Sequence, residues 1–412
     1  MSENILVVGG GFSGITAALE AAEVGHEVYL VEKAPFLGGR VMQLNKYFPK
    51  LCPPSCGLEI QFQRIKNNSN LKFFTLAEVT SVSGNAGNYE VKLRLKPRHT
   101  PPTSVDLKSL EKSLKQKVPN DFEFNLSKRK PLYKDVPFAF PNRYVLETQT
   151  LEEEDRKKLE ESEYIDLEEK EKNISLNVGS IILATGWKPY DTTNLTNLGA
   201  GRINNCISNM QMERLASPNG PTQGRIERPS DAKPPKNVAF VQCAGSRDQN
   251  HLNFCSYICC MASLKQAQYI REQYPDTKIT IYYIDLRTPG RYEKFAQNIL
   301  TDPKINTVKG KVADIEEDIS DDGVLLTVED ALTGNKSQEH FDMAVLATGM
   351  QPNLSRESLP FDISLDEDGF IVNGDEKGIF AAGCAKEPLD VMKSAQSATS
   401  AAMKAIQTVR GR

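Results

Sequence analysis

Eight cysteines supply the most reactive side chains of this 412-residue sequence, and four of them lie within eighteen residues. These four are Cys243, Cys255, Cys259 and Cys260, with the spacing C-x11-C-x3-C-C. Four soft thiolates in one short segment suit a [4Fe–4S] cluster, which takes one thiolate at each iron. Two alternatives stay open. One is a zinc site, although structural zinc sites favour cysteine pairs two to four residues apart, and the other is a group of buried cysteines that bind no metal.

A second pair, Cys52 and Cys56, encloses Pro53-Pro54-Ser55. Two prolines are excluded from a helix interior, so we expect this segment to be a loop. The pair is either a redox-active dithiol or two ordinary thiols in the wall of a pocket. In a reducing compartment, cysteines grouped in this way indicate metal or redox chemistry rather than a disulfide framework.

The N-terminal residues predict the scaffold that positions these thiols. An apolar run over residues 5–8 leads into the glycine-rich residues 9–14, and an alanine-rich helix follows. Gly9 permits a sharp turn, Gly11 leaves room for a pyrophosphate, and Gly14 lets the helix pack against the strand. The helix N-terminus then faces the phosphates. This pattern predicts a dinucleotide site; the alternative is a structural βαβ unit that binds nothing.

The next strand, residues 27–31, ends on Glu32, which Lys33 follows. An acid at this position is placed to accept hydrogen bonds from a ribose 2′-hydroxyl. A little further on, Gly39 in a Gly-Gly pair brings backbone amides close to a second phosphate or a flavin ring, and Arg40 adds positive charge there. A plain turn is the alternative.

Composition excludes several classes of protein. The 50 basic and 54 acidic residues give a formal charge of −4 and a pI near 5.8, so the chain has no strong nucleic-acid or anionic-membrane footprint. We find no run of about 18 apolar residues and no signal peptide, so we expect no direct membrane span. We predict a cytoplasmic protein that a partner subunit holds at a membrane.

Two similar apolar strands end on Ala-Thr-Gly, the first at Thr185-Gly186 and the second at residues 347–349. Small residues there permit close backbone approach where the chain crosses between domains. We therefore predict an α/β fold with two dinucleotide-binding, Rossmann-like domains, the second inserted into the first. The predicted parts are residues 1–100 and 341–412 for the first domain, 101–178 for a charged, proline-containing insertion, 179–204 for a crossover, and 205–340 for the second domain with the iron–sulfur site.

The second domain lacks its usual phosphate-binding motif. A strand is expected over residues 237–241, but it leads into Cys243-Ala244-Gly245-Ser246-Arg247 rather than GxGxxG. A helix over residues 261–270 follows the cysteines, and its N-terminal dipole suits an anionic cluster.

The glycine motif, Glu32-Lys33 and Leu37-Gly38-Gly39-Arg40 together resemble FAD-binding flavoproteins of the disulfide reductase type. The resemblance implies FAD as cofactor, a backbone contact to adenine near Val79, and a flavin-binding turn at Gly383 before a long helix over residues 389–409. It also implies a cysteine pair near the flavin. This turn usually reads Gly-Asp; here Cys384 replaces the acid, so the side-chain hydrogen bond to the ribityl chain is in doubt.

Residues 241–248, 255–261 and 265–267 resemble the A-type subunit of heterodisulfide reductase, and the resemblance extends over nearly the whole chain. It implies that the four clustered cysteines hold a cluster near FAD. Larger family members carry ferredoxin modules that this sequence lacks. Residues 50–59 make the chain most similar to the A-type subunit of the quinone-interacting membrane-bound oxidoreductase (Qmo) complexes of sulfate reducers.

This resemblance implies an electron-transfer subunit with FAD and a [4Fe–4S] cluster, between a quinone-linked membrane partner and adenylylsulfate reductase. The implied partners are a membrane quinone-interacting subunit, together with a second flavin and iron–sulfur subunit. One alternative is a stand-alone NAD(P)H-dependent disulfide reductase that uses Cys52 and Cys56. The other is a flavoprotein scaffold whose cofactors serve assembly.

Overall fold

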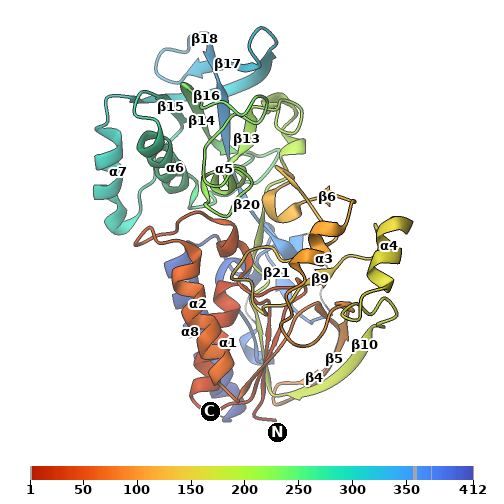
Figure 1. The fold of residues 1–412 in the computed structure, drawn as a ribbon. Coiled ribbons are helices and arrows are strands. Elements are labelled where there is room, and N and C mark those ends of the chain that lie inside the picture. Colours follow the sequence, from red (N-terminus) through yellow and green to blue (C-terminus); the bar gives the residue numbers. More distant parts are fainter. Residues whose placement is uncertain (1, 356–359, 373, 412) are drawn as a thin grey trace. The chain divides into compact units, whose positions relative to one another are not determined.

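The computed structural model describes residues 2–355, 360–372 and 374–411. It divides into two compact units: one comprises Met1–Trp187 with Pro352–Arg412, and the other is Lys188–Gln351. The chain therefore leaves the first unit once and returns to it once, as the colours of Figure 1 show. Among the described residues, none of the helices combines the length and the apolar character that crossing a bilayer requires.

A five-stranded parallel sheet forms the centre of the first unit, in the order β23-β11-β1-β2-β3. Its strands are β1 (Ile5–Val8), β2 (Val28–Val31), β3 (Leu71–Phe74), β11 (Ser180–Leu183) and β23 (Ile379–Ala381). All four residues of β1 are buried, because protein covers both faces of the sheet. Short, continuous apolar runs are typical of strands in this position.

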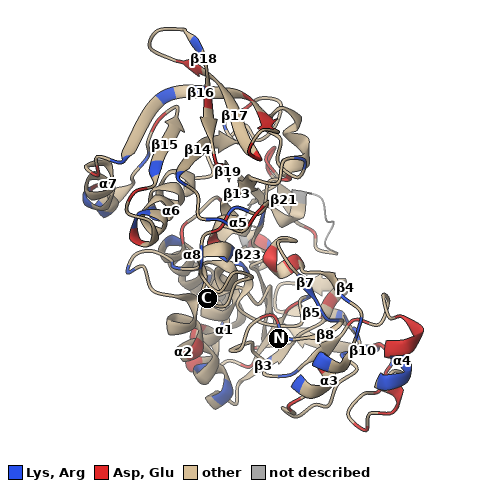
Figure 2. Cartoon of the chain, turned by 45° about the horizontal axis from the view of Figure 1, so that its top comes forward, with Lys and Arg blue, Asp and Glu red and all other residues tan. Residues whose placement is uncertain are grey.

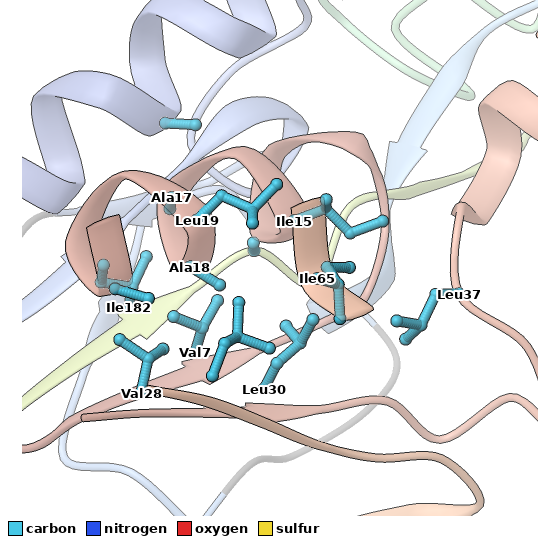
Figure 3. Packing of buried hydrophobic residues seen from close by; sticks show 14 of the residues in the cluster. Val7, Ile15, Ala17, Ala18, Leu19, Val28, Leu30, Leu37, Ile65 and Ile182 are labelled. Atoms are coloured by element: carbon cyan, nitrogen blue, oxygen red, sulfur yellow. The ribbon is translucent and has the colours of Figure 1, made fainter. Parts of the chain in front are cut away.

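Three helices cover one face of this sheet: α1 (Phe12–Glu23), α2 (Pro54–Asn67) and α8 (Val391–Val409). Figure 3 shows Ile15 and Leu19 of α1 above Val7, Leu30 and Ile182 of the strands. The buried positions of α8 are mostly alanines, which allow it to pack closely against α1.

An antiparallel three-stranded sheet covers the other face. Its strands are β4 (Ala77–Asn85), β5 (Asn88–Leu95) and β10 (Lys172–Val178), in the order β10-β5-β4. Alternate residues of β5, namely Tyr89, Val91 and Leu93, are buried against Leu6 and Ile181 of the parallel sheet. This period of two is the pattern of a sheet with one covered face.

The segment between β5 and β10 forms an insertion with a small core of its own, made by Leu107, Leu114, Leu132, Leu146 and Leu159. Its elements are α3 (Lys108–Ser113), β6 (Val118–Pro119), β7 (Lys128–Arg129), β8 (Leu132–Tyr133), β9 (Val145–Leu146) and α4 (Glu153–Glu160). Strand pairs β6–β7 and β8–β9 are antiparallel. Figure 2 shows acidic and basic residues along α4, whose sequence from Glu153 to Glu160 has one apolar residue.

The second unit has a seven-stranded sheet in the order β13-β19-β14-β15-β16-β17-β18. Its strands are β13 (Cys206–Ser208), β14 (Asn237–Ala244), β15 (Lys278–Tyr283), β16 (Ile305–Asp318), β17 (Gly323–Asp330), β18 (Lys336–Phe341) and β19 (Met343–Thr348). The helices are α5 (Asn209–Ala216), α6 (Cys259–Gln273) and α7 (Glu293–Leu300). Strands β13 to β16 and β19 pair in parallel, whereas β16, β17 and β18 form an antiparallel meander. Four short strands complete the described structure: β12 (Trp187–Pro189), β20 (Met350–Pro352), β21 (Ser364–Leu365) and β22 (Ile371–Val372).

Two predicted helix boundaries were wrong. Helix α2 begins at Pro54, so Cys56 lies in its first turn rather than on a loop. Proline is tolerated in the first turn, where its missing N–H has no intrahelical acceptor. Helix α6 begins at Cys259, so two of the clustered cysteines belong to the helix itself.

Asp155 ties α4 to the rest of the insertion. Its buried carboxylate accepts hydrogen bonds from the backbone amides of Lys115 (2.9 Å) and Gln116 (2.8 Å). Burial acts to raise the pKa of Asp155, but these amides and the nearby Lys158 outweigh burial and hold the pKa below its ordinary value of 3.8.

We expect Asp155→Asn to lower the opening free energy of α4 by about 1–3 kcal/mol, because the buried amides lose a charged acceptor. Hydrogen exchange of the α4 amides measures this change. The ionised carboxylate contributes fully to the stability of the native state at neutral pH. This contribution is lost as the pH falls below 3.8 and the carboxylate is protonated. The control is Glu154→Gln, whose exposed pairing with Lys115 contributes little. Equal protection in both variants would contradict this role for Asp155.

Candidate functional site

Three glycines of the β1–α1 turn have two different roles. A Cβ on Gly9 (φ +107°) would lie 2.2 Å from the carbonyl oxygen of Ala184, and one on Gly14 would lie 1.8 Å from the carbonyl oxygen of Gly9. These two positions therefore exclude side chains for reasons of packing. Gly11 has an ordinary φ of −77°, and a Cβ there would have no neighbour closer than 3.8 Å. Packing within the protein therefore does not require a glycine at position 11, whereas the approach of a pyrophosphate would.

Glu32 lies beside this turn at the end of β2. Its carboxylate accepts hydrogen bonds from the backbone amides of Gly10 (2.6 Å) and Ala34 (2.7 Å). Burial raises the pKa of Glu32, against the opposing effect of these amides. Lys33 is exposed. The position of Glu32 next to the glycine turn is the one that recognition of a ribose requires.

The second glycine pair packs directly on the first turn. The amide of Gly38 donates to the carbonyl of Gly10 (2.8 Å), and a Cβ on Gly39 (φ +59°) would lie 2.8 Å from the Cα of Gly11. Arg40 follows, partly buried, with its Nε donating to the Trp187 carbonyl (3.1 Å). Burial lowers the pKa of Arg40, and the nearby Glu32 partly opposes this effect.

Two further predicted positions join the same end of the parallel sheet. Thr185, directly after the Ala184 that touches Gly9, has a buried Oγ1 without a hydrogen-bond partner in the described part of the chain. An unpaired buried hydroxyl fits a site that a polar ligand completes. Asn353 was not predicted as a site residue. Its backbone N–H donates to the carbonyl of Gly186 (3.2 Å), and its side-chain amide donates to the backbone carbonyl of Thr185 (2.5 Å).

The C-terminal turn lies against the start of α1. A Cβ on Gly383 would lie 2.1 Å from Oγ of Ser13, which was not predicted as a site residue. The buried thiol of Cys384 lies 3.4 Å from the Leu389 carbonyl and 3.7 Å from Oγ of Ser394. Burial raises the pKa of Cys384 to about 11, so the thiol is neutral at pH 7 and supplies no negative charge. Val79 is on β4, and its contact with adenine stays a prediction.

The structure thus gathers the glycine turn, Glu32, the second glycine pair, Thr185 and Gly383 at the carboxyl ends of parallel strands. Ligands of open α/β sheets bind at this edge. A glycine at position 11 that protein packing does not require and the unpaired buried hydroxyl of Thr185 fit a dinucleotide such as FAD.

Cys52 and Cys56 lie on different elements. Cys52 is partly buried and its carbonyl accepts from the amide of Tyr47 (3.0 Å), whereas Cys56 is exposed on α2. Burial raises the pKa of Tyr47, and both cysteines add to the rise, which places them near its hydroxyl. The thiols are not joined. Their role as a redox pair stays a prediction.

The four clustered cysteines come together in the second unit. Cys243 is the second-last residue of β14, and Cys255 lies in the loop that follows this strand. Cys259 and Cys260 occupy the first turn of α6. Burial raises the pKa of Cys259 well above its usual value, and the other three cysteines each add to this rise. Burial likewise raises the pKa of Cys243 and of Cys260. The four sulfurs therefore share one largely buried site.

The separation of the four sulfurs bears on the metal that they could hold. Tetrahedral zinc brings its sulfur ligands to within about 3.8 Å of one another. No three of these four sulfurs lie within 4.8 Å of one another. Thiolates on four different irons are farther apart than thiolates on one ion. Four thiols are the donor set that a [4Fe–4S] cluster takes, and the identity of the metal stays a prediction.

The loop that carries Cys243 has an unusual backbone. Cys243 (φ +57°), Arg247 (φ +55°) and Tyr257 (φ +65°) are non-glycine residues in the left-handed region. Such conformations cost free energy and concentrate at functional sites. A buried hydrogen bond between Ser246 and Ser256 (2.8 Å) holds the two arms of the loop together.

Comparisons with known proteins agree with this geometry. Residues 4–48 match the family model for FAD dependent oxidoreductases. The chain is 36% identical over 420 residues to the second iron-sulfur A-type subunit of CoB--CoM heterodisulfide reductase from Methanopyrus kandleri. It is 35% identical over 425 residues to the corresponding iron-sulfur A-type subunit from Methanocaldococcus jannaschii. Each alignment covers 98% of this chain and 64% of the relative.

This chain is homologous to the A-type subunit of heterodisulfide reductase. The homology confirms the resemblance inferred from the cysteine motif. The chain spans somewhat less than two thirds of the length of these relatives.

Solved structures show the fold. Thioredoxin reductase from Lactococcus lactis superimposes with a TM-score of 0.54 at 14% identity, over the full length of both chains. Thioredoxin reductase from T. acidophilum gives 0.53 at 15% identity, over 98% of this chain and 99% of that one. The predicted fold class, that of FAD-dependent disulfide reductases, is confirmed.

The two roles of the glycines are separable by substitution. We expect Gly11→Ala to leave the thermal unfolding of the apoprotein unchanged, because the methyl group would meet no atom closer than 3.8 Å. We expect it to weaken FAD binding at least tenfold, because the pyrophosphate needs a close approach to the backbone at this position. Flavin fluorescence titration measures the affinity. We expect Gly14→Ala to destabilise the apoprotein itself, because its Cβ would meet the carbonyl oxygen of Gly9. An unaltered FAD affinity in Gly11→Ala would argue against this site.

Proposed function

We propose that this chain is an electron-transfer subunit of a multi-subunit oxidoreductase and that it holds FAD in its first unit and a [4Fe–4S] cluster in its second. The observation that carries the proposal is the site of four thiols, which lies on a flavoprotein fold. Homology to the A-type subunit of heterodisulfide reductase supports the same combination.

Bound FAD would accept two electrons together and release them singly, which joins a two-electron donor to one-electron clusters. The residues of the chain serve to bind and orient. The glycine turn and the N-terminus of α1 would hold the pyrophosphate, and Glu32 would hold the ribose. Cys243, Cys255, Cys259 and Cys260 would hold the cluster, while Arg247, paired with Asp285 at 2.9 Å, supplies positive charge near these thiols.

The physiological role that we propose is electron transfer between a membrane quinone-linked partner and adenylylsulfate reductase in sulfate respiration. The resemblance of residues 50–59 to the A-type subunit of Qmo complexes supports this choice. The protein would act in the cytoplasm and reach the membrane through a partner. The proposed partners are a quinone-interacting subunit, together with a second flavin and iron–sulfur subunit.

A stand-alone NAD(P)H-dependent disulfide reductase is the second candidate. The thioredoxin reductase fold and the position of Cys52 and Cys56 near Tyr47 favour it. One feature argues against this candidate. Strand β14 ends with Cys243 and Ala244, and Cys243 has a left-handed backbone conformation, where a nucleotide-binding domain would have a glycine-rich turn. Bleaching of the flavin by NADPH or NADH in the isolated protein would favour this candidate.

The proposal is tested on anaerobically purified protein. Flavin and iron content are measured, and low-temperature EPR spectra are recorded before and after reduction with dithionite. We expect about one FAD and four irons per chain. We expect Cys255→Ser to lose the reduced-cluster signal and most of the iron while FAD is retained, because the two cofactors bind to different units.

The control is Cys206→Ser, in the same unit. Cys206 is buried, donates to the Leu198 carbonyl (3.0 Å) and has a pKa that burial raises to about 12, so it is a structural thiol. This variant keeps its iron if the assignment is right. Loss of FAD together with iron in Cys255→Ser would contradict separate sites, and retention of all four irons would contradict the assignment of Cys255 as a ligand.

A further inference from the structure

The insertion of the first unit contains a cavity that neither proposed cofactor uses. Its volume is about 250 Å³, and it opens between the β6–β7 hairpin and the start of β8. Residues of both signs line it: Lys117, Lys128, Arg129, Lys130 and Lys134, with Glu111 and Asp135, and the neutral Asn120 and Tyr133.

The lining has an excess of positive charge. Five cations and two carboxylates line it, and the carboxylate of Glu147 pairs with Arg129, which leaves two positive charges around one small space. Lys117 and Lys128 have exposed side chains and form no ion pair within the described residues. Figure 2 shows the basic β7 strand that supplies Lys128. Cations that converge on a cavity attract a ligand of opposite charge.

Other groups around the cavity are fixed in place. The guanidinium of Arg129 stacks on Tyr133, 3.5 Å from the ring centroid, and donates to Glu147 at 2.7 Å. The ammonium of Lys130 donates to the Leu114 carbonyl. Burial raises the pKa of Tyr133 to about 12, so its hydroxyl stays neutral and able to donate. A stacked arginine loses little freedom when it binds an oxyanion.

Asn120 adds an acceptor to this cationic site. Its Oδ1 is buried and has no hydrogen-bond partner in the part of the chain that the structure describes, while its Nδ2 donates to Oγ of Ser127 at 3.3 Å. A buried carbonyl oxygen without a donor costs free energy that a bound hydroxyl or amide restores. The cavity therefore suits a ligand that combines an oxyanion with a hydrogen-bond donor.

We propose that this cavity binds a small phosphorylated compound that carries a hydroxyl group. The excess of two positive charges selects a divalent phosphate over a single carboxylate, and Asn120 accepts from the hydroxyl. The volume lies just below the usual range of ligand pockets, about 300–1,000 Å³, which excludes an intact dinucleotide. A peptide segment of a partner protein is also too large for so small a space.

Calorimetric titration of the FAD-loaded protein with glycerol 3-phosphate, inorganic phosphate and glycerol tests this proposal. We expect glycerol 3-phosphate to bind more tightly than phosphate, glycerol not to bind, and the affinity to fall as the salt concentration rises. We expect the double variant Lys117→Gln/Lys128→Gln to lower the affinity for both anions at least tenfold. We expect Asn120→Leu to lower the affinity for glycerol 3-phosphate until it approaches the affinity for inorganic phosphate.

The matched control is Lys108→Gln/Lys112→Gln, which removes the same charge from α3 outside the cavity lining. We expect this variant to bind both anions as the original chain does. Equal weakening in the two double variants would show a general charge effect and overturn the site. The proposal is also overturned if neither anion binds at millimolar concentration, or if polyglutamate binds instead, which would indicate a docking surface for acidic protein.

Discussion

Close backbone approach at the β1–α1 turn is the constraint on which the first unit depends. The carbonyl of Gly9 fills the place that a side chain at position 14 would take, and the carbonyl of Ala184 does the same at position 9. These contacts bring α1, β1 and the end of β11 together at one point. The second glycine pair then packs on Gly11. Gly11 differs from Gly9 and Gly14 in that a Cβ there would meet no atom closer than 3.8 Å, so its lack of a side chain is better explained by a ligand that approaches the backbone.

The insertion is connected to this site. Between β6 and β7, the carbonyl of Phe122 accepts from Nε2 of Gln43 at 3.1 Å, and the ring of Phe124 lies 5.9 Å from the guanidinium carbon of Arg40. The base of the same hairpin lines the cationic cavity through Asn120 and Lys128. The hairpin therefore spans the distance between the cavity and the residues beside the glycine turn.

The sequence predicted the features that depend on local patterns. The glycine motif, Glu32 and the first Ala-Thr-Gly strand have fixed spacings, so their positions at one edge of the five-stranded sheet followed from known chemistry. The loop predicted between Cys52 and Cys56 was wrong, because two prolines indicate a loop although Pro54 is compatible with the first turn of a helix. The core of the insertion was not predicted, since its leucines lie far apart in the chain and follow no single period. Likewise, no local signal marks Asn353, whose role arises only from tertiary contact with Thr185.

The inserted position of the second unit has a consequence for biosynthesis. Residues 188–351 are contiguous, so this unit has its whole sheet once they have left the ribosome. The first unit still lacks β23, which pairs with β11, and α8, which packs on α1, until residues 379–409 are made. Domains generally fold as units during synthesis. The four thiols can thus come together before residues 379–409, which complete the sheet and helix layer of the first unit, have been made.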